Sequence, residues 1–409
     1  MTITAQASAQ TEAQPLLSRL SRVTTSGRFI PEIDGFRFIA IISVFILHDF
    51  GQVMAKNGKG VDSQRHVDLN LLNGADHAVA TTVLSAGSFG VQLFFVISGF
   101  ILGLPFAEHH LLGKKKPSLS AYLMRRVTRL EPPYLISLIV YAIALGLYYH
   151  WQIGDTLKHF GASVLYLHNQ IYNEISTING VAWSLEVEVQ FYLLAPLLAY
   201  LFAIRSTKAR RWILMMIILA AAALNNALAP PTMRYQGSIA NAIQYFLAGF
   251  FLADLHVLNP SFLKSKHIVW DGIALLSALV MIVSLVAGGG PSGRFTFHLP
   301  ICIILFYLAG FKSVVFSRFL AFPPIYLVGG MCYTIYLYHG LVIMEGAQLT
   351  RFSYLQNAPL WANFLIQFVL HASVTLAVCI LLFKLIERPC MKRDWPQQLW
   401  RRLRGPALP

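Results

Sequence analysis

Two residues that can do chemistry, Arg37 and His48, lie eleven residues apart in the largely apolar segment 31–51. Eleven residues make about three helical turns, so both side chains would share one face, about 16 Å apart. Histidine can act as a general base near neutral pH, and an ionisable pair inside a membrane helix predicts a functional site. The alternative is that Arg37 anchors the helix at the membrane interface and His48 is a hydrogen-bonded packing residue.

A second candidate is the basic cluster Arg125, Arg126 and Arg129 in the segment KKKPSLSAYLMRRVTRLEPPY, residues 114–134. Guanidinium groups bind phosphates through two parallel hydrogen bonds, so the cluster would suit a phosphorylated donor. Topology signals or contacts with anionic lipids would explain the same residues. Pro132 and Pro133 follow, and we expect them to break or start a helix.

Further polar residues interrupt other apolar runs. Ser98 lies in FFVISGF, and Tyr333, Tyr336 and His339 recur every three residues, which places them on roughly one helical face. Trp183 opens WSLEVEVQFY, which carries Glu186 and Glu188. Aromatic stripes more often pack in a core, and Ser-Gly pairs more often serve close helix packing.

The elements that position these residues are predicted to be membrane helices. Of the 409 residues, 56% are hydrophobic and only 12% charged, against about 25% charged in soluble proteins. The net charge of +14 does not indicate a nucleic-acid partner, because the basic residues lie in short loops between apolar runs. We therefore expect an all-α, polytopic integral membrane protein surrounded by lipids.

Ten spans of about 20 apolar residues are expected. They are 36–54, 89–107, 133–150, 182–204, 212–229, 239–258, 268–288, 298–312, 323–346 and 360–386. With both termini cytoplasmic, 24 Lys and Arg fall in inner segments and 7 in outer loops, as the positive-inside rule requires. We expect a disordered tail over 1–30, with no cleaved signal peptide, a membrane domain over 31–390 and a basic tail over 391–409.

The expected topology brings several polar residues to similar depths. His48, Glu188 and His339 would lie in the outer half of the bilayer and Ser98 near its midplane. No metal is expected, because the four cysteines form no CxxC pair and three of them lie inside apolar runs. The convergence of His, Glu and Ser predicts a shared site.

Six motifs together resemble the membrane acyltransferase 3 family, bacterial membrane enzymes that O-acylate glycans. The chain shows them in the family order: IDGFR followed by His48, FFVISGF, RRxxRLxPxY, WSLxxExxFY, YxxYLxH and IERP. They cover roughly residues 31–390. The chain departs from the family at Glu131, Glu186, Val189 and Cys332. Many relatives carry a C-terminal extracellular hydrolase-like domain, and we expect this protein to lack it.

The resemblance implies site residues. Arg37 and His48 match the family's essential arginine and histidine, Arg126 and Arg129 its paired loop arginines, and Glu188 its span-four glutamate. Glu186 lies nearly half a turn round the helix from Glu188, so only one of the two can face His48.

The resemblance also implies a reaction, the transfer of an acetyl or short acyl group from acyl-CoA to a sugar hydroxyl. Donor phosphates would bind Arg126 and Arg129 at the cytoplasmic face, with Arg125 beside them. Arg37 would lie where the donor enters the membrane domain. His48 would be the general base, oriented by Glu188, while Asp34 would pair with Arg37. A transient acyl-His48 relay, or less readily an acyl-Ser98, stays open.

The acceptor would be a cell-surface polysaccharide or its lipid-linked precursor, such as O-antigen (the lipopolysaccharide glycan) or exopolysaccharide, at the bacterial inner membrane. Outer loops 55–88 and 151–181 are expected to shape its site, with His150, His159, His168, Tyr166 and Tyr172. A rival hypothesis is a transporter or flippase of a lipid-linked sugar or acyl group, for which ten spans with polar midplane residues would also be suitable. A non-catalytic scaffold or sensor would leave the layered His, Glu and Arg residues unexplained.

Overall fold

The computed structural model describes residues 29–57, 74–148, 152–259, 261, 265–288, 297–350, 355, 358–392 and 394–398. Over these residues the protein is all-helical, without a β-strand. The expected disordered tail falls outside this part of the chain except for its last two residues. Most of the expected basic tail 391–409 also falls outside it.

The longer helices are α2 (Pro31–Asn57), α3 (Gly74–Leu112), α4 (Leu119–Tyr148), α7 (Trp183–Leu198), α8 (Thr207–Leu228), α10 (Ile239–Leu258), α12 (Val269–Gly288), α13 (Leu299–Lys312), α16 (Cys332–Leu349) and α17 (Leu360–Leu382). Shorter helices connect them: α5 (Ile153–Val164), α6 (His168–Tyr172), η2 (Gly180–Ala182), η3 (Ala199–Ala203), α9 (Met233–Gln236), α14 (Val315–Leu320), α15 (Pro323–Gly330), η5 (Phe383–Glu387) and α18 (Arg388–Cys390).

Seven of the described helices are long and apolar enough to cross a membrane, or eight if the bent pair α15–α16 forms one span. This is the composition of a multi-pass membrane protein. Every expected span coincides with a helix or helix pair, but α2 is not among these eight and α13 is shorter than a span. The total of ten spans and the cytoplasmic termini therefore stay predictions.

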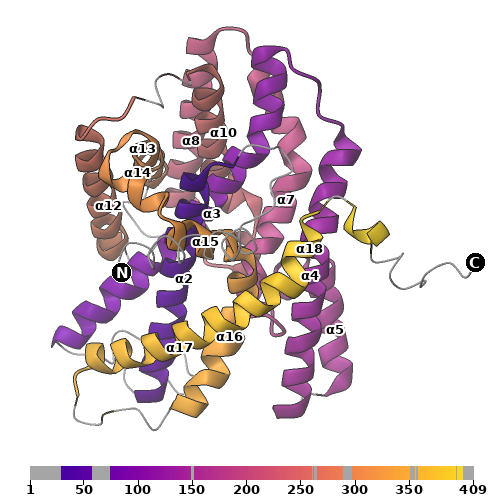
Figure 1. The fold of residues 1–409 in the computed structure, drawn as a ribbon, viewed down its shortest axis with the longest axis vertical. Helices are drawn as coiled ribbons and strands as arrows, with labels where there is room; N and C mark the ends of the chain where they lie inside the picture. Colours follow the sequence, from indigo (N-terminus) through magenta and orange to yellow (C-terminus); the bar gives the residue numbers. More distant parts are fainter. Residues whose placement is uncertain are drawn as a thin grey trace, which may run out of the picture.

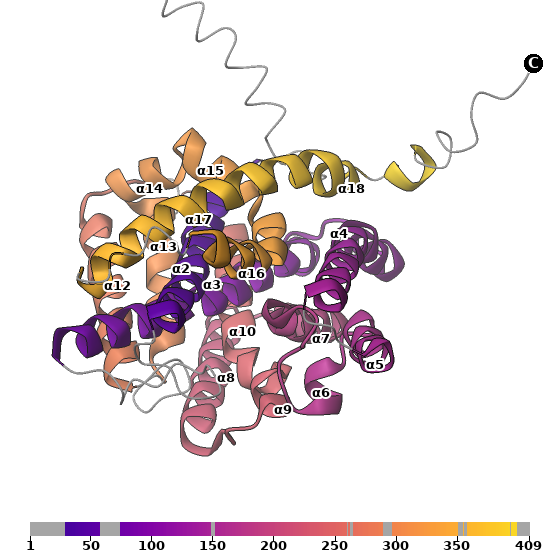
Figure 2. The ribbon, with the colours of Figure 1, turned by 90° about the horizontal axis from the view of Figure 1, so that it is seen from below.

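Helix α3 lies at the centre and packs against both α2 and α10 (Figure 1). Seen from below, α17 runs along one side of the bundle, while α4 and α5 lie together at another edge (Figure 2). The main core gathers aromatic and branched side chains of α2, α3, α7, α10 and α13. Three of the helices that surround the site, α2, α3 and α7, therefore share one core.

Close helix contact requires glycine at the centre of α3. A Cβ added at Gly99 would lie 2.2 Å from the backbone oxygen of Phe246 on α10. Only a residue without a side chain lets the two backbones approach this closely. The packing that was expected of the Ser98-Gly99 pair is thus confirmed for Gly99, and it leaves Ser98 on α3 to serve the site.

The segment expected as one span over 323–346 is two helices. α15 ends at Gly330, and α16 begins at Cys332 with a bend of 74° between them. A Cβ at Gly329 would lie 1.7 Å from the backbone oxygen of Asp34, so the end of α15 is pressed against the start of α2. The bend brings the first turns of α16, which carry Tyr333 and Tyr336, to the site.

The prediction that Pro132 and Pro133 would break or start a helix is wrong. Helix α4 runs unbroken from Leu119 to Tyr148 through both prolines. Proline has no N–H, so Pro132 leaves the carbonyl of Thr128 without its usual helical donor. The indole Nε1–H of Trp395 donates to that carbonyl at 2.9 Å. This bond from the C-terminal segment compensates for the missing helical one.

Candidate functional site: an arginine-lined cavity

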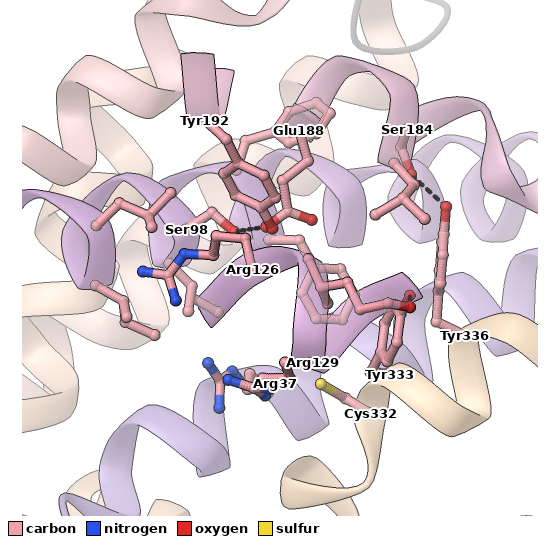
Figure 3. Close-up of a pocket in the computed structure, with 17 residues that line it drawn as sticks. Arg37, Ser98, Arg126, Arg129, Ser184, Glu188, Tyr192, Cys332, Tyr333 and Tyr336 are labelled. Atoms are coloured by element: carbon pink, nitrogen blue, oxygen red, sulfur yellow. Dashed lines mark hydrogen bonds between the residues drawn. The ribbon is translucent and has the colours of Figure 1, made fainter. Parts of the chain in front are cut away.

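Five helices enclose a cavity of about 130 Å³ (Figure 3). Residues from α2, α3, α4, α7 and α16 line it, although they are far apart in the sequence. Its polar or reactive lining residues are Arg37, Ser98, Arg126, Arg129, Ser184, Glu188, Tyr192, Cys332, Tyr333 and Tyr336. Most of these were predicted as site residues, and the fold brings them together.

Three guanidinium groups reach the cavity. Arg37 is buried, and its Nη1 donates to Asp34 Oδ1 at 2.6 Å, which confirms the expected pairing with Asp34. Arg126 and Arg129 line the same cavity from α4. Arg125 does not join them: its side chain is exposed, and its Nε–H donates to the carbonyl of Ala121 one turn back. Arg125 therefore lies outside the cavity, although it shares a helix face with Arg129 four residues further on.

The two cavity arginines of α4 retain unused donors. The guanidinium of Arg126 lies 5.3 Å from the ring centre of Tyr122 and 5.9 Å from that of Tyr192, as in cation–π contacts. The Nε atoms of Arg126 and Arg129 are buried without a hydrogen-bond partner among the described residues. Such donors are costly unless a ligand or water satisfies them, so the site is suited to an anion.

Glu188 faces the arginines from α7. Its Oε1 accepts a hydrogen bond of 2.5 Å from Ser98 Oγ, across a separation of ninety residues (Figure 3). Among the residues that line the cavity in the described chain, it carries the one carboxylate, against three arginines. The lining therefore has a net positive charge, which attracts an anionic group.

Two tyrosines of α16 close the cavity on another side. Tyr333 donates through its hydroxyl to the carbonyl of Leu130 at 2.9 Å, and Tyr336 to that of Val181 at 2.6 Å. The Tyr336 hydroxyl also lies 3.1 Å from Ser184 Oγ. These bonds tie α16 to α4 and α7, so the tyrosines are fixed parts of the wall.

His48 does not line the cavity, and its neighbour is His339. The Nε2 of His339 lies 3.2 Å from Nδ1 of His48, and the His48 Nδ1 also lies 2.9 Å from the carbonyl of Val44. The Nδ1 of His339 lies 2.9 Å from the carbonyls of Ile335 and Tyr336, to which it must donate. His339 Nε2 is then the acceptor and His48 Nδ1–H the donor, which leaves the lone pair on Nε2 of His48.

The prediction that Glu188 orients His48 is therefore not met in the structure, since Glu188 bonds Ser98 and the ring beside His48 is His339. Glu186 has a different task. Its two carboxylate oxygens accept the backbone N–H groups of His168 and Asn169 at 3.2 and 3.0 Å. Those bonds hold the start of α6 against α7. Of the two glutamates, Glu188 is the one at the cavity.

Trp183 was also predicted as a site residue but does not line the cavity. Its carbonyl accepts from the Nδ2 of Asn169, which adds to the α6–α7 contact. Sequence reasoning did not single out the lining residues Tyr192 and Ser184, although both belong to the WSLxxExxFY motif. The motif was the signal that could have identified them.

A buried polar network next to His48 was also missed. Asp49 Oδ1 lies 2.5 Å from Nδ1 of His371, whose Nε2 lies 3.0 Å from Thr350 Oγ1. In a second buried contact, Glu387 at the end of η5 accepts from the backbone N–H and hydroxyl of Thr334. The Asp49–His371 and Thr334–Glu387 contacts join residues 322 and 53 positions apart, and the His371–Thr350 contact joins residues 21 apart, so no local pattern could reveal them.

Between α5 and α6, outside the membrane helices, Tyr166 has a left-handed backbone with φ of 57° and donates to Glu131 Oε1 at 2.9 Å. Burial raises the pKa of Tyr166, and the Glu131 carboxylate raises it further. Burial also lowers the pKa of His168. Tyr166 therefore keeps its proton and His168 is neutral at neutral pH.

Comparison with known proteins gives consistent matches. The family model described as "Acyltransferase domain" matches residues 30–384. "O-acetyltransferase OatA" of Staphylococcus aureus (strain NCTC 8325 / PS 47) is 25% identical over 396 residues, covering 90% of this chain and 58% of that protein.

"Peptidoglycan O-acetyltransferase OatA" of Listeria monocytogenes is 24% identical over 399 residues, covering 90% of this chain and 57% of that protein. The chain thus spans less than two thirds of the length of both relatives. No solved structure gives a significant match.

Proposed function

The chain belongs to the membrane acyltransferase 3 family, and from this premise we propose that it is a membrane O-acyltransferase. It moves an acetyl or short acyl group from acyl-CoA to a hydroxyl of a carbohydrate. The relatives named above are O-acetyltransferases, and one is a peptidoglycan O-acetyltransferase. For this chain the proposed acceptor is a cell-surface glycan or its lipid-linked precursor.

The donor binds through its phosphates to the arginines. Arg126 and Arg129 hold buried Nε donors that phosphate oxygens would satisfy, and Arg37 adds a third cation, oriented by Asp34. A cavity of about 130 Å³ is smaller than the roughly 300–1,000 Å³ of whole-ligand pockets, so it takes only part of the donor. Glu188 can accept an amide N–H of the pantetheine arm while it holds Ser98.

His48 is the general base of the transfer. Its Nε2 carries the lone pair, since His339 and Val44 hold the Nδ1–H. Nε2 takes the proton from the acceptor hydroxyl, and the oxygen attacks the thioester carbonyl. The carbon–sulfur bond breaks, and the imidazolium returns the proton to the coenzyme A thiolate.

The donor and the acceptor then approach His48 from different sides of the membrane. Arg37 and His48 lie on α2 eleven residues apart, about 16 Å along the helix, a distance that the pantetheine arm of the donor would bridge between phosphate and thioester. Acyl-CoA is a cytoplasmic donor, so we place the protein in the bacterial inner membrane with the arginines toward the cytoplasm. No acyl-enzyme is needed for this route.

The observation that carries the proposal is that Arg37, Arg126 and Arg129 line the same cavity as the Ser98–Glu188 pair. The test is purified protein in proteoliposomes with [¹⁴C]acetyl-CoA and a panel of glycan acceptors. We expect label to appear on the glycan, and His48→Ala to abolish it. A transporter or flippase would leave the thioester of acetyl-CoA intact. If the thioester stays intact with every acceptor tested, the proposal is refuted.

A further inference from the structure

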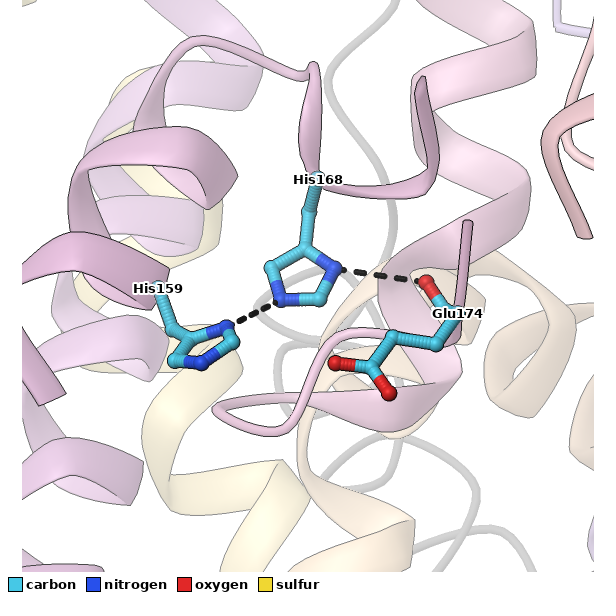
Figure 4. A group of neighbouring side chains, drawn as sticks. All are labelled: His159, His168 and Glu174. Atoms are coloured by element: carbon cyan, nitrogen blue, oxygen red, sulfur yellow. Dashed lines mark hydrogen bonds between the residues drawn. The ribbon is translucent and has the colours of Figure 1, made fainter. Parts of the chain in front are cut away.

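Two histidines and a glutamate meet away from the cavity, between α5 and the segment that follows α6 (Figure 4). The group consists of His159, His168 and Glu174, each of which offers one ligand atom. Those atoms all lie within 4.8 Å of one another. His168 is fully buried, His159 half-buried and Glu174 exposed, so the group opens to the surface on one side.

The hydrogen bonds aim the two imidazoles at one point. His168 donates its Nδ1–H to the carbonyl of Glu174 at 3.3 Å, which leaves the lone pair on Nε2. That Nε2 lies 2.8 Å from Nδ1 of His159 (Figure 4). A histidine whose Nδ1–H is held by a backbone carbonyl is the usual arrangement of a metal-binding histidine.

The backbone around the group is held in place. Asn173 ends α6 in the left-handed conformation, with φ of 58°, so the chain turns back and Glu174 comes next to His168. Glu186 of α7 accepts the N–H groups of His168 and Asn169. The Tyr172 ring lies 4.3 and 4.8 Å from the rings of His159 and His168.

We propose that His159, His168 and Glu174 bind a divalent transition metal ion of the kind that prefers imidazole, with Zn²⁺ the best fit. Two histidines and one glutamate form a known zinc ligand set, with a water in the fourth position. Tetrahedral bonds of about 2.0–2.1 Å place two nitrogens about 3.3 Å apart, so the 2.8 Å pair must open by about half an ångström.

Protons balance when the ion enters. The proton that His159 shares with His168 moves to Nε2 of His159, and both facing nitrogens then offer lone pairs. Glu174 contributes its negative charge from the surface side and can reach the ion by a side-chain rotation, because it is exposed. The metal thus replaces one hydrogen bond between neutral rings.

The bound ion links α5 to α6. Through the bonds of Glu186 to the start of α6, it also braces α7, which carries Glu188 two residues further on. The role that follows is to stabilise and position this segment, not to take part in acyl transfer. The proposal is independent of the proposed function.

The test uses the full chain without a histidine tag, purified in detergent, stripped with EDTA and dialysed. Zn²⁺ is titrated by isothermal calorimetry, bound metal is measured by plasma mass spectrometry, and Co²⁺ is used as a spectroscopic probe. We expect one ion per chain, Co²⁺ bands typical of tetrahedral nitrogen and oxygen ligands, and a higher unfolding temperature with Zn²⁺. Wild-type protein that binds no zinc would overturn the proposal.

Variants locate the site. His159→Ala and Glu174→Gln change side chains that are not fully buried, and each should weaken Zn²⁺ binding at least tenfold and remove the temperature shift. The matched control is His110→Ala, from a histidine pair with ring centres 4.8 Å apart, which no third ligand group joins among the described residues. Unchanged binding in His159→Ala, or an equal loss in His110→Ala, would refute the assignment.

Discussion

The Nε2 of His339 on α16 lies 3.2 Å from the Nδ1 of His48 on α2, although 291 residues separate them in the chain. His339 is fully buried, and its own Nδ1–H is held by backbone carbonyls of the preceding turn. Its acceptor nitrogen therefore has a fixed position. This fixes which nitrogen of His48 is basic, which is the requirement for a general base.

We predict that His48→Ala lowers kcat about 10²- to 10⁴-fold, the usual contribution of a general base. His339→Ala should lower kcat less, about tenfold, and leave KM for the donor unchanged, because it acts only through His48. His339→Gln keeps an acceptor and should restore part of the rate. Steady-state acyl transfer by folded variants checks this, and a larger loss for His339→Ala than for His48→Ala would contradict it.

The arginines provide a matched comparison within one helix. Arg126→Ala and Arg129→Ala should each raise KM for the donor about 10- to 100-fold, since a hydrogen bond to a charged group contributes about 1.5–3 kcal/mol. Arg125→Ala should leave KM within twofold, because its side chain is exposed and outside the cavity. Initial rates measured against acyl-CoA concentration give KM for each variant. An equal rise in KM for all three variants would contradict this prediction and indicate a general charge effect.

Substitution of Glu186 should lower stability, whereas substitution of Glu188 should lower activity. Glu186→Gln replaces an acceptor oxygen of a group that holds two backbone N–H donors, so we expect the free energy of unfolding to fall by about 1–3 kcal/mol. Glu188→Gln should keep stability but lower acyl transfer, because it removes the cavity carboxylate. Unfolding curves in detergent and acyl-transfer rates are measured on both variants. A loss of stability in Glu188→Gln with unchanged stability in Glu186→Gln would contradict the prediction.

Gly329→Ala should prevent correct folding, because a Cβ there would lie 1.7 Å from the carbonyl oxygen of Asp34 and push α15 off α2. Gly272→Ala on α12 is the control, since its Cβ would meet nothing within 4 Å. Alanine there should be neutral or stabilising by up to about 1 kcal/mol. Size-exclusion profiles and unfolding temperatures measure both, and a well-folded Gly329→Ala protein would be inconsistent with this packing.

Much of the site could be predicted because membrane helices carry local signals. The spacing of Arg37 and His48 and the period of Tyr333 and Tyr336 follow from chain-local rules, and Glu188 was implied by the resemblance of WSLxxExxFY to the family motif. Proline behaviour was mispredicted, since the indole that satisfies Thr128 lies 267 residues away. The same limit applies to the bend between α15 and α16, which depends on contact with α2.

The sequence by itself determined the class of protein, the helices and most of the polar residues of the site, because hydropathy and helical period act over a few turns. Only the tertiary structure decided the partners: His339 for His48, Ser98 for Glu188 and the start of α6 for Glu186. It also brought together His159, His168 and Glu174. Partners depend on which helices become neighbours and on their rotation, and these are set by packing across the whole bundle.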